Sequence, residues 1–351
     1  MMPNTESPAA NSRLGPLLID LDGLALTSQE QELLADPLVG GVILFSRNYS
    51  SPQQLQNLVA DVRRVRSDLL LCVDQEGGRV QRFKAGFTCL PALGHIPALS
   101  KKSGVDLHRL VRMHASVMAS ELLAVGIDFS FAPVVDINYG HNEVIADRSF
   151  GSESGLITEL SSLYVNELNQ WGMAATAKHF PGHGYVSEDT HVATAVDTRS
   201  KQQILSVDGE PFRALIAQGV AGIMPAHVIY PAVDELPAVQ SRRWIEEVLR
   251  GELGFTGAVI GDDLGMAGAA GESGVEYKTT KAIAAGCDLV MVCNNRQHLL
   301  LALKQLHEMD TDHLADYRCA RRCLLSRRPA LDHCSDFTLD EARQVLATSL
   351  L

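Results

Sequence analysis

The sequence lacks the features that mark membrane and secreted proteins. No apolar run in its 351 residues approaches the roughly 18 residues that a membrane-spanning helix needs. The N-terminus does not show the basic, apolar and small-residue order of a signal peptide. No repeat, low-complexity tract or linker divides the chain. We therefore expect one folded unit with no membrane partner.

Paired cysteines and excess positive charge are also missing. The seven cysteines are odd in number, scattered, and form no Cys-x-x-Cys pair. This pattern is typical of reduced thiols and predicts a cytoplasmic location. The 30 Lys and Arg are outnumbered by 42 Asp and Glu, which gives a formal net charge of −12. A net acidic chain disfavours nucleic acid and anionic membranes as partners, so an anionic substrate group would need a few local Arg or Lys.

Eight short apolar runs, each ending at a polar residue, alternate with segments of helical spacing such as 51–66, 105–126 and 241–253. The runs occupy residues 17–22, 40–47, 69–76, 129–136, 173–179, 220–227, 257–263 and 287–295. Buried strands that alternate with helices form a parallel sheet, and eight such units favour a closed barrel. We predict an α/β fold with a single-domain (β/α)8 barrel of the TIM type over residues 14–310. Residues 1–13 are expected to be a disordered extension, and residues 311–351 to be helices packed on the barrel.

The barrel prediction locates the chemistry, because active sites of such barrels lie at the C-terminal ends of the strands. Nearly every run ends on Asp, His, Lys, Arg or Asn. Asp and Asn often cap the following helix, which is the structural alternative. Capping does not explain Lys178, His179 or His227, so we expect functional side chains at this rim.

The segment KHFPGHGYVSEDTH at 178–191 is the most specific. A metalloprotease helix would need His179 and His183 one turn apart, but Pro181 and two glycines forbid a helix there. In an extended loop the two-residue spacing of Asp189 and His191 lets both side chains point the same way. The carboxylate would then orient an acid/base histidine. The alternative is a polar surface loop.

Two further segments end predicted strands with acids. In GAVIGDDLGMAG at 257–268, Asp262 is well placed as a nucleophile, whereas Asp263 is a candidate helix cap. In VDQEGGRVQRF at 73–83, Asp74 ends a strand, and two glycines allow Arg79 and Arg82 to return toward the rim. A carboxylate beside the planar guanidinium of an Arg can hydrogen-bond to two neighbouring sugar hydroxyls. The alternative is that the Asp and Arg form an ion pair with a purely structural role. Arg148 lies in ADRSF, a long loop after the fourth run.

These motifs together resemble glycoside hydrolase family 3, specifically the bacterial β-N-acetylglucosaminidases of peptidoglycan recycling. The resemblance runs in order from about residue 16 to about residue 300. It rests on KHFPGHG with the downstream Asp-x-His, DQEGGRVQR, RNY at 47–49, MPAHVIY at 224–230, DDL at 262–264 and AGCDLVMVCNN at 285–295. Two positions depart from the usual family pattern, since Gly261 replaces a Ser before DDL and Thr190 replaces the Ser of Asp-Ser-His.

The resemblance implies a role for each matching residue. Asp262 would be the catalytic nucleophile, His191 the acid/base and Asp189 its dyad partner. The sugar-binding positions would be Asp74, Arg82, Arg148, Lys178 and His179. No metal or organic cofactor is implied.

The implied reaction is a retaining hydrolysis of terminal β-linked N-acetylglucosamine. The implied substrates are peptidoglycan-derived fragments in which this sugar is linked to anhydro-N-acetylmuramic acid, with or without a peptide. The enzyme would act in cell-wall recycling, and through it in cell shape and division, as a monomer or weak dimer. Three alternatives stay open: an N-acetylglucosaminide phosphorylase, a metal-dependent barrel hydrolase using Lys178, His179, His227 and Asp262, and a non-catalytic sugar-binding protein.

Overall fold

A closed parallel barrel forms the centre of the molecule in the computed structural model, which describes residues 14–187, 195–265, 274–309, 325 and 335–347. Its eight strands follow one another around the barrel in chain order. They are β1 (Leu17–Asp20), β2 (Val39–Leu44), β3 (Leu70–Val73), β6 (Phe129–Ser130), β7 (Thr176–Phe180), β9 (Gly222–Pro225), β12 (Ala258–Gly261) and β13 (Leu289–Val292). Parallel bridges Phe129↔Ala174 and Val134↔Lys178 close the ring between β6 and β7. The predicted barrel is therefore confirmed.

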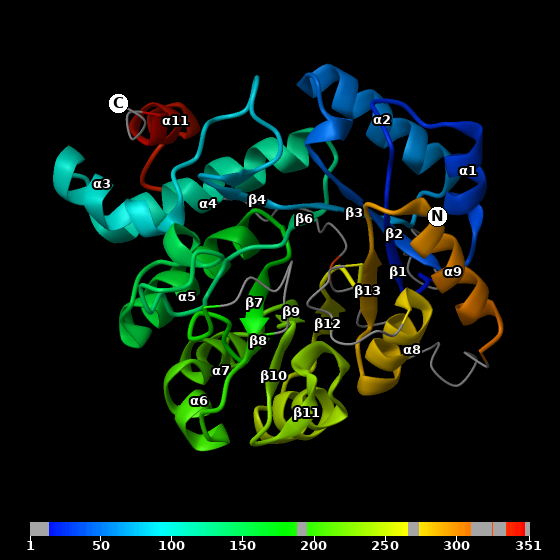
Figure 1. Cartoon of the computed structure of the whole chain (residues 1–351). Coiled ribbons are helices and arrows are strands. Elements are labelled where there is room, and N and C mark those ends of the chain that lie inside the picture. The colour runs from blue at the N-terminus through cyan, green and yellow to red at the C-terminus, as the bar shows by residue number, and fades with distance from the viewer. Residues whose placement is uncertain (1–13, 188–194, 266–273, 310–324, 326–334, 348–351) are drawn as a thin grey trace, which may run out of the picture.

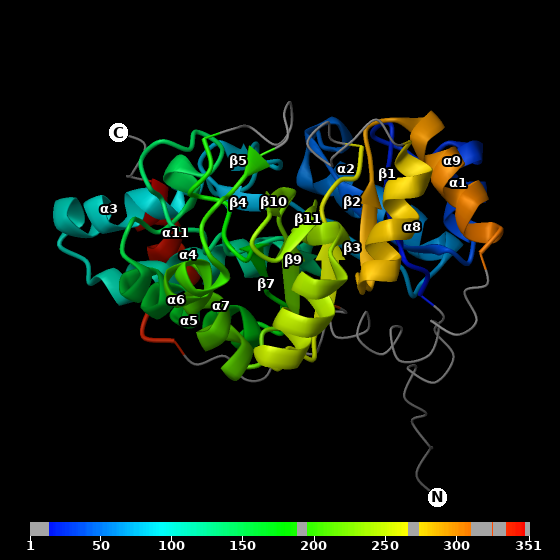
Figure 2. The same cartoon turned by 60° about the horizontal axis from the view of Figure 1, so that its bottom comes forward.

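Helices surround the strands on all sides in both views (Figures 1 and 2). They are α1 (Ser28–Ala35), α2 (Pro52–Val65), α3 (Ile96–Ser103), α4 (Leu107–Ala124), α5 (Ser154–Gln170), α6 (Lys201–Val207), α7 (Gly209–Ala217), α8 (Val275–Ala285), α9 (Arg296–His307) and α11 (Leu339–Ala347). Shorter helical turns are η2 (Ser46–Asn48), η3 (Leu93–His95), η4 (Ala146–Arg148) and η5 (Ala238–Gln240), and η6 (Arg243–Glu252) is π-helical. The barrel strands are buried along their whole length, as expected of strands covered on both faces.

Helix α2 shows how the sequence specifies these elements. Ser51 caps it by accepting a hydrogen bond from the Gln54 amide, and Pro52 occupies the first turn, where its missing N–H is not needed. Its buried residues Leu55, Leu58, Val59 and Val62 recur at helical spacing and face the barrel. The observed bounds lie within the predicted 51–66.

Small strands outside the barrel extend its C-terminal rim. β4 (Gln75–Gly77) and β5 (Val80–Gln81) form a hairpin after β3, whereas β8 (Ala195–Val196), β10 (Val228–Tyr230) and β11 (Asp234–Pro237) form a three-stranded sheet. The fourth apolar run, predicted as a strand up to Asp136, is regular only at Phe129–Ser130. Pro133 lacks an N–H for the ladder there, which shortens the strand.

The outer boundaries of the predicted domain stay predictions, because residues 1–13 and most of 310–334 lie outside the described part. Helix α11 packs against α4, where Arg343 pairs with Glu121. Cys72, Cys89 and Cys293 are free thiols. Over the described ranges, no helix is both long and apolar enough to span a membrane.

Candidate active site

A pocket of about 670 Å³ opens at the C-terminal ends of the barrel strands. This volume is in the range of small-molecule sites. The five predicted sugar-binding residues and Asp262 all line it. The full lining is Asp74, Glu76, Arg79, Val80, Arg82, His141, Glu143, Val144, Arg148, Lys178, His179, His183, Ser187, Met224, His227 and Asp262. Predicted Asp189 and His191 lie outside the described residues; Ser187, just before that gap, is part of the pocket wall.

The hairpin after β3 explains how Arg82 returns to Asp74. Gly77 and Gly78 have φ of 101° and 57°, which side chains disfavour, and a Cβ at Gly77 would lie 2.4 Å from the Pro91 carbonyl oxygen. The side chain of Gln75 fixes the return strand by accepting the Arg82 amide at 3.0 Å. The Arg82 guanidinium then lies 3.2 Å from the Asp74 carboxylate.

Glu76 is the centre of a buried ion network at the pocket floor. It accepts two hydrogen bonds of 2.8 Å from Arg148, and the Lys178 ammonium lies 2.6 Å from it. Lys178 also contacts Asp74 at 3.0 Å. The side chains of Glu76 and Lys178 are only 2% and 3% exposed, so neither charge is stabilised by bulk water. The network holds two of the predicted sugar-binding cations in fixed positions.

The charges of this network shift one another's pKa values. Burial alone would raise the pKa of Glu76, but Arg148 and Lys178 hold it well below its ordinary value. Burial alone would lower the pKa of Lys178, but Asp74 and Glu76 hold it above the usual range. The pKa of Arg148 is likewise raised, against its burial, by Glu76 and Asp74. All these groups therefore stay ionised at neutral pH.

A buried carboxylate also holds His179. Asp136 accepts from the His179 ring nitrogen Nδ1 at 2.7 Å, from the His179 amide at 3.1 Å and from the His183 amide at 2.7 Å. Burial alone would raise the pKa of Asp136, and its interactions with His179 and His183 lower it. Because the Asp136 carboxylate can only accept a hydrogen bond, Nδ1 of His179 carries a proton.

The two acids after β12 have different surroundings. Asp262 lines the pocket. Burial alone would raise its pKa, but His227, His179 and Lys178 hold the pKa below its ordinary value. Asp263 instead accepts from the amides of Gly265 at 2.9 Å and Cys293 at 3.2 Å, which ties β12 to β13. Burial raises the pKa of Asp263 to about 6. Asp262 is thus the acid of the pair that lines the pocket, and its lowered pKa keeps it ionised at neutral pH.

The residues of the metal-site alternative do not form a donor set. Lys178 is an ammonium held by two carboxylates, and an ammonium has no lone pair to offer a metal. Over the described ranges, no three His, Cys, Asp or Glu side chains are grouped to hold a metal ion.

Glu76 and Asp136 support the pocket, and neither was among the site residues predicted from the sequence. Glu76 lies two residues after Asp74, and this spacing puts both side chains on one face of an extended segment. The two-residue alternation of side chains along an extended segment is therefore a sequence signal that places Glu76 beside Asp74. Asp136 was identified only as the end of a strand, because its partners are 43 and 47 residues away.

Comparisons with known proteins agree with this geometry. Residues 13–317 match the family model described as glycosyl hydrolase family 3 N terminal domain. A β-hexosaminidase of Nitrosospira multiformis is 47% identical and covers 88% of each chain, and one of Alkalilimnicola ehrlichii is 46% identical and covers 91% of each. The crystal structure of NagZ from Neisseria gonorrhoeae in complex with N-trifluoroacetyl-D-glucosamine is 34% identical, with a TM-score of 0.84 over 95% of this chain and 98% of that one.

Proposed function

This chain belongs to glycosyl hydrolase family 3, and from this premise we propose that it is a retaining exo-β-N-acetylglucosaminidase. Its glycoside hydrolase class follows from the family, and its likeness to β-hexosaminidases over nine-tenths of their length makes it a β-N-acetylhexosaminidase. The observation that carries the finer proposal is the ionised Asp262 in a pocket lined by a fixed set of charged hydrogen-bonding groups.

The pocket binds the terminal sugar in this proposal. Asp74 accepts from sugar hydroxyls, while Arg82, Arg148 and Lys178 donate to hydroxyl or carbonyl oxygens, with His179 beside them. The buried Glu76 and Asp136 keep these donors oriented before the sugar arrives, which reduces the free energy needed to order them on binding.

The reaction runs in two displacements. The Asp262 carboxylate attacks the anomeric carbon, the bond to the leaving oxygen breaks, and His191 donates its proton to that oxygen. Water then attacks the same carbon, His191 takes the proton, and the bond to Asp262 breaks. Asp189 stabilises the protonated His191 before the first step and again after the second. The roles of His191 and Asp189 rest on the family resemblance.

His183 belongs to the same sequence motif but suits the acid role poorly. Its burial and the nearby His179 lower its pKa to about 4. The ring is therefore neutral near pH 7 and has no extra proton to donate to a leaving oxygen.

The proposed substrates are cytoplasmic cell-wall fragments in which N-acetylglucosamine is linked to anhydro-N-acetylmuramic acid, with or without a peptide. The solved relative with N-trifluoroacetyl-D-glucosamine supports an N-acylated sugar as the bound group. A pocket of about 670 Å³, walled by rim loops, suits a chain end better than the middle of a polymer. The protein acts as a monomer or weak dimer in this proposal.

One assay separates this proposal from its alternatives. Release of nitrophenol is measured from the β-N-acetylglucosaminide and from the β-glucoside, with and without phosphate, and products from the disaccharide and from intact cell wall are identified by mass spectrometry. We expect preference for the N-acetylated substrate, free N-acetylglucosamine as product, and action on the disaccharide. A sugar phosphate as main product would establish a phosphorylase, and efficient internal cutting of the polymer would contradict the exo mode.

A further inference from the structure

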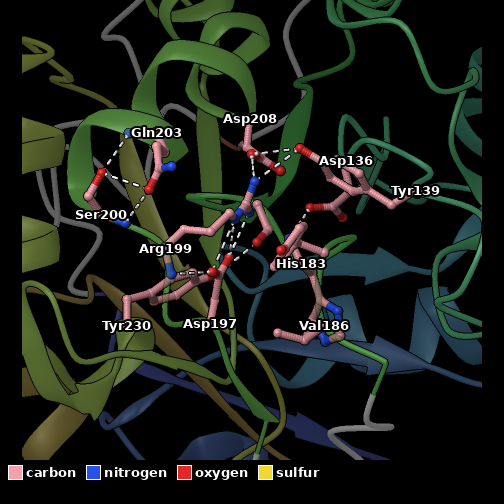
Figure 3. Close-up of polar contacts among 12 residues, drawn as sticks. Asp136, Tyr139, His183, Val186, Asp197, Arg199, Ser200, Gln203, Asp208 and Tyr230 are labelled. Carbon is pink, nitrogen blue, oxygen red and sulfur yellow. Dashed lines mark hydrogen bonds and ion pairs between the residues drawn. The ribbon is translucent and has the colours of Figure 1, made fainter.

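Arg199 is the central residue of a polar cluster beside the active-site pocket (Figure 3). The other members of this cluster are Tyr139, Tyr185, Asp197 and Asp208. Its guanidinium donates to Asp197 at 2.6–3.1 Å and to Asp208 at 2.8 Å. The same group lies 3.9 Å from the ring centre of Tyr185. It is thus a planar fork with carboxylates at its edge and an aromatic ring on its face, a geometry that lysine does not reproduce.

The cluster holds its charges away from water. The side chains of Asp197 and Asp208 are fully buried and that of Arg199 is 13% exposed. Burial alone would lower the pKa of Arg199, but the two carboxylates raise it. Tyr139 donates its hydroxyl to Asp208 at 3.1 Å, and burial raises its pKa to about 12, so this donor stays protonated. Two buried carboxylates share one guanidinium, and its loss would leave them without that cation.

The cluster contacts the chain on both sides of residues 188–194. On the earlier side, Tyr185 stacks on Arg199, and a Cβ at Gly182 would lie 2.5 Å from the Asp208 Cβ. The Tyr230 hydroxyl donates to the Gly182 carbonyl at 2.9 Å. On the later side, Asp197 follows β8 directly and its amide donates to Ile229 at 2.9 Å. The two flanks are therefore fastened to each other and to the β9–β10 region of the barrel.

We propose that Arg199 is a positioning residue for proton transfer, because it fixes both flanks of the segment that carries Asp189 and His191. This inference rests on the proposed role of His191 as the acid/base. The sugar-binding residues lie on other elements, and Arg199 makes its side-chain hydrogen bonds to Asp197, Asp208 and Tyr139 within the described ranges. Loosening the cluster should therefore weaken proton delivery while leaving sugar binding nearly unchanged.

Arg199→Lys tests this, because it keeps one positive charge and removes the fork. A misplacement of about 1 Å costs up to roughly a hundredfold in rate, so we expect kcat/KM on the natural disaccharide to fall about 10- to 100-fold. The loss on a nitrophenyl glycoside should be under about threefold, since its leaving oxygen needs little protonation. The inhibition constant of N-acetylglucosamine, which reports sugar binding, should change less than about threefold. Equal losses on both substrates, or a weakened inhibition constant, would overturn the proposal.

Arg250→Lys is the matched control. Arg250 is 8% exposed, pairs with the fully buried Asp288 at 2.7 Å and lies near the Phe255 ring, remote in sequence from the cluster. It should lower stability without changing the ratio of activities on the two substrates. Tyr185→Leu, at a residue that is 41% exposed, serves if Arg199→Lys does not fold. It should shift the ratio in the same direction, and where Arg199→Lys does fold the two changes should combine non-additively.

Amide hydrogen exchange separates this inference from the proposed function. Exchange of the peptides covering 181–187 and 195–200 should speed up in Arg199→Lys and not in Arg250→Lys. Faster exchange together with an unchanged substrate ratio would show that the cluster fixes the flanks but does not serve proton transfer. Unchanged exchange would refute the cluster's anchoring role. If His191→Ala also leaves the ratio of activities on the disaccharide and the nitrophenyl glycoside unchanged, the proposed acid/base is wrong. If this ratio changes in His191→Ala but not in Arg199→Lys, only the role of Arg199 is overturned.

Discussion

Replacing Glu76 by Gln tests the idea that a buried anion organises the sugar pocket. Gln keeps the shape of the side chain, but its amide group presents N–H donors to Arg148 or Lys178, which are themselves donors. Breaking a buried ion pair by removing one partner costs about 3–5 kcal/mol. Asp74 still pairs with Lys178 at 3.0 Å. We therefore expect a loss near the lower end, about 3 kcal/mol of unfolding free energy.

Sugar binding should weaken in the same variant. Hydrogen bonds to charged groups contribute about 1.5–3 kcal/mol, and a misoriented Arg148 or Lys178 would lose such a bond. The inhibition constant of N-acetylglucosamine should therefore rise about 10- to 100-fold. Urea unfolding and competitive inhibition measure the two effects on one preparation.

The control for Glu76→Gln is Asp61→Asn, which removes an ion pair with Arg64 whose side chains are 41% and 73% exposed. Solvent weakens such pairs, so the change should stay within about 0.5 kcal/mol. A loss below about 1 kcal/mol in Glu76→Gln, with unchanged inhibition, would refute the reasoning.

The pH dependence of Glu76→Gln has a defined sign. The folded-state pKa of Glu76 lies below its ordinary value of 4.5. Its contribution is therefore fully present above that value and is lost as the pH falls toward the folded-state pKa. The stability difference between wild type and Glu76→Gln should be constant from pH 7 to about 5.5 and shrink below about pH 4.5.

Three other outcomes are expected. The folded state holds the Asp263 proton more tightly than the unfolded state does, so wild-type stability should fall as the pH rises from 3.8 to about 6. Asp263→Asn should flatten this fall. A dependence of the unfolding free energy on pH that is unchanged in the variant, measured by urea unfolding, would contradict this. His191→Ala should lose about 10²–10⁴ in rate on the disaccharide and much less on the nitrophenyl glycoside, with partial rescue by azide; equal losses without rescue would move the acid elsewhere, with Glu188 tested next. Dialysis against a chelator should leave nitrophenyl turnover unchanged, and a loss restored by a divalent metal would revive the metal-dependent alternative.

The barrel was predictable because its signal is local. Each strand is a short apolar run that ends at the rim, and each of the eight runs overlaps a barrel strand. The fourth run was predicted too long as a regular strand, since Pro133 lacks an N–H for the ladder. The chain bridges β7 again only at Val134, and the Asp136 carboxylate then accepts from His179. Single strand-end residues such as Lys178 and Asp262 were predictable for the same reason.

The supporting contacts were not predictable in this way. Arg148 and Glu76 are 72 residues apart, and Arg199 reaches Tyr139 over 60 residues. Only the closure of the barrel brings these pairs together, so no spacing in the sequence reveals them. Sequence patterns thus identified the groups expected to touch the substrate better than the groups that hold them in place.

The most direct test of the central claim is to find which residue bonds to the sugar. A slowly reacting fluorinated N-acetylglucosamine analogue is incubated with the enzyme, and the digest is mapped by mass spectrometry. The account predicts a covalent sugar on Asp262, within the peptide covering 257–268, and no turnover by Asp262→Ala. An adduct on another peptide, or wild-type turnover by Asp262→Ala, would contradict the account and favour attack by the acetamido oxygen of the substrate itself.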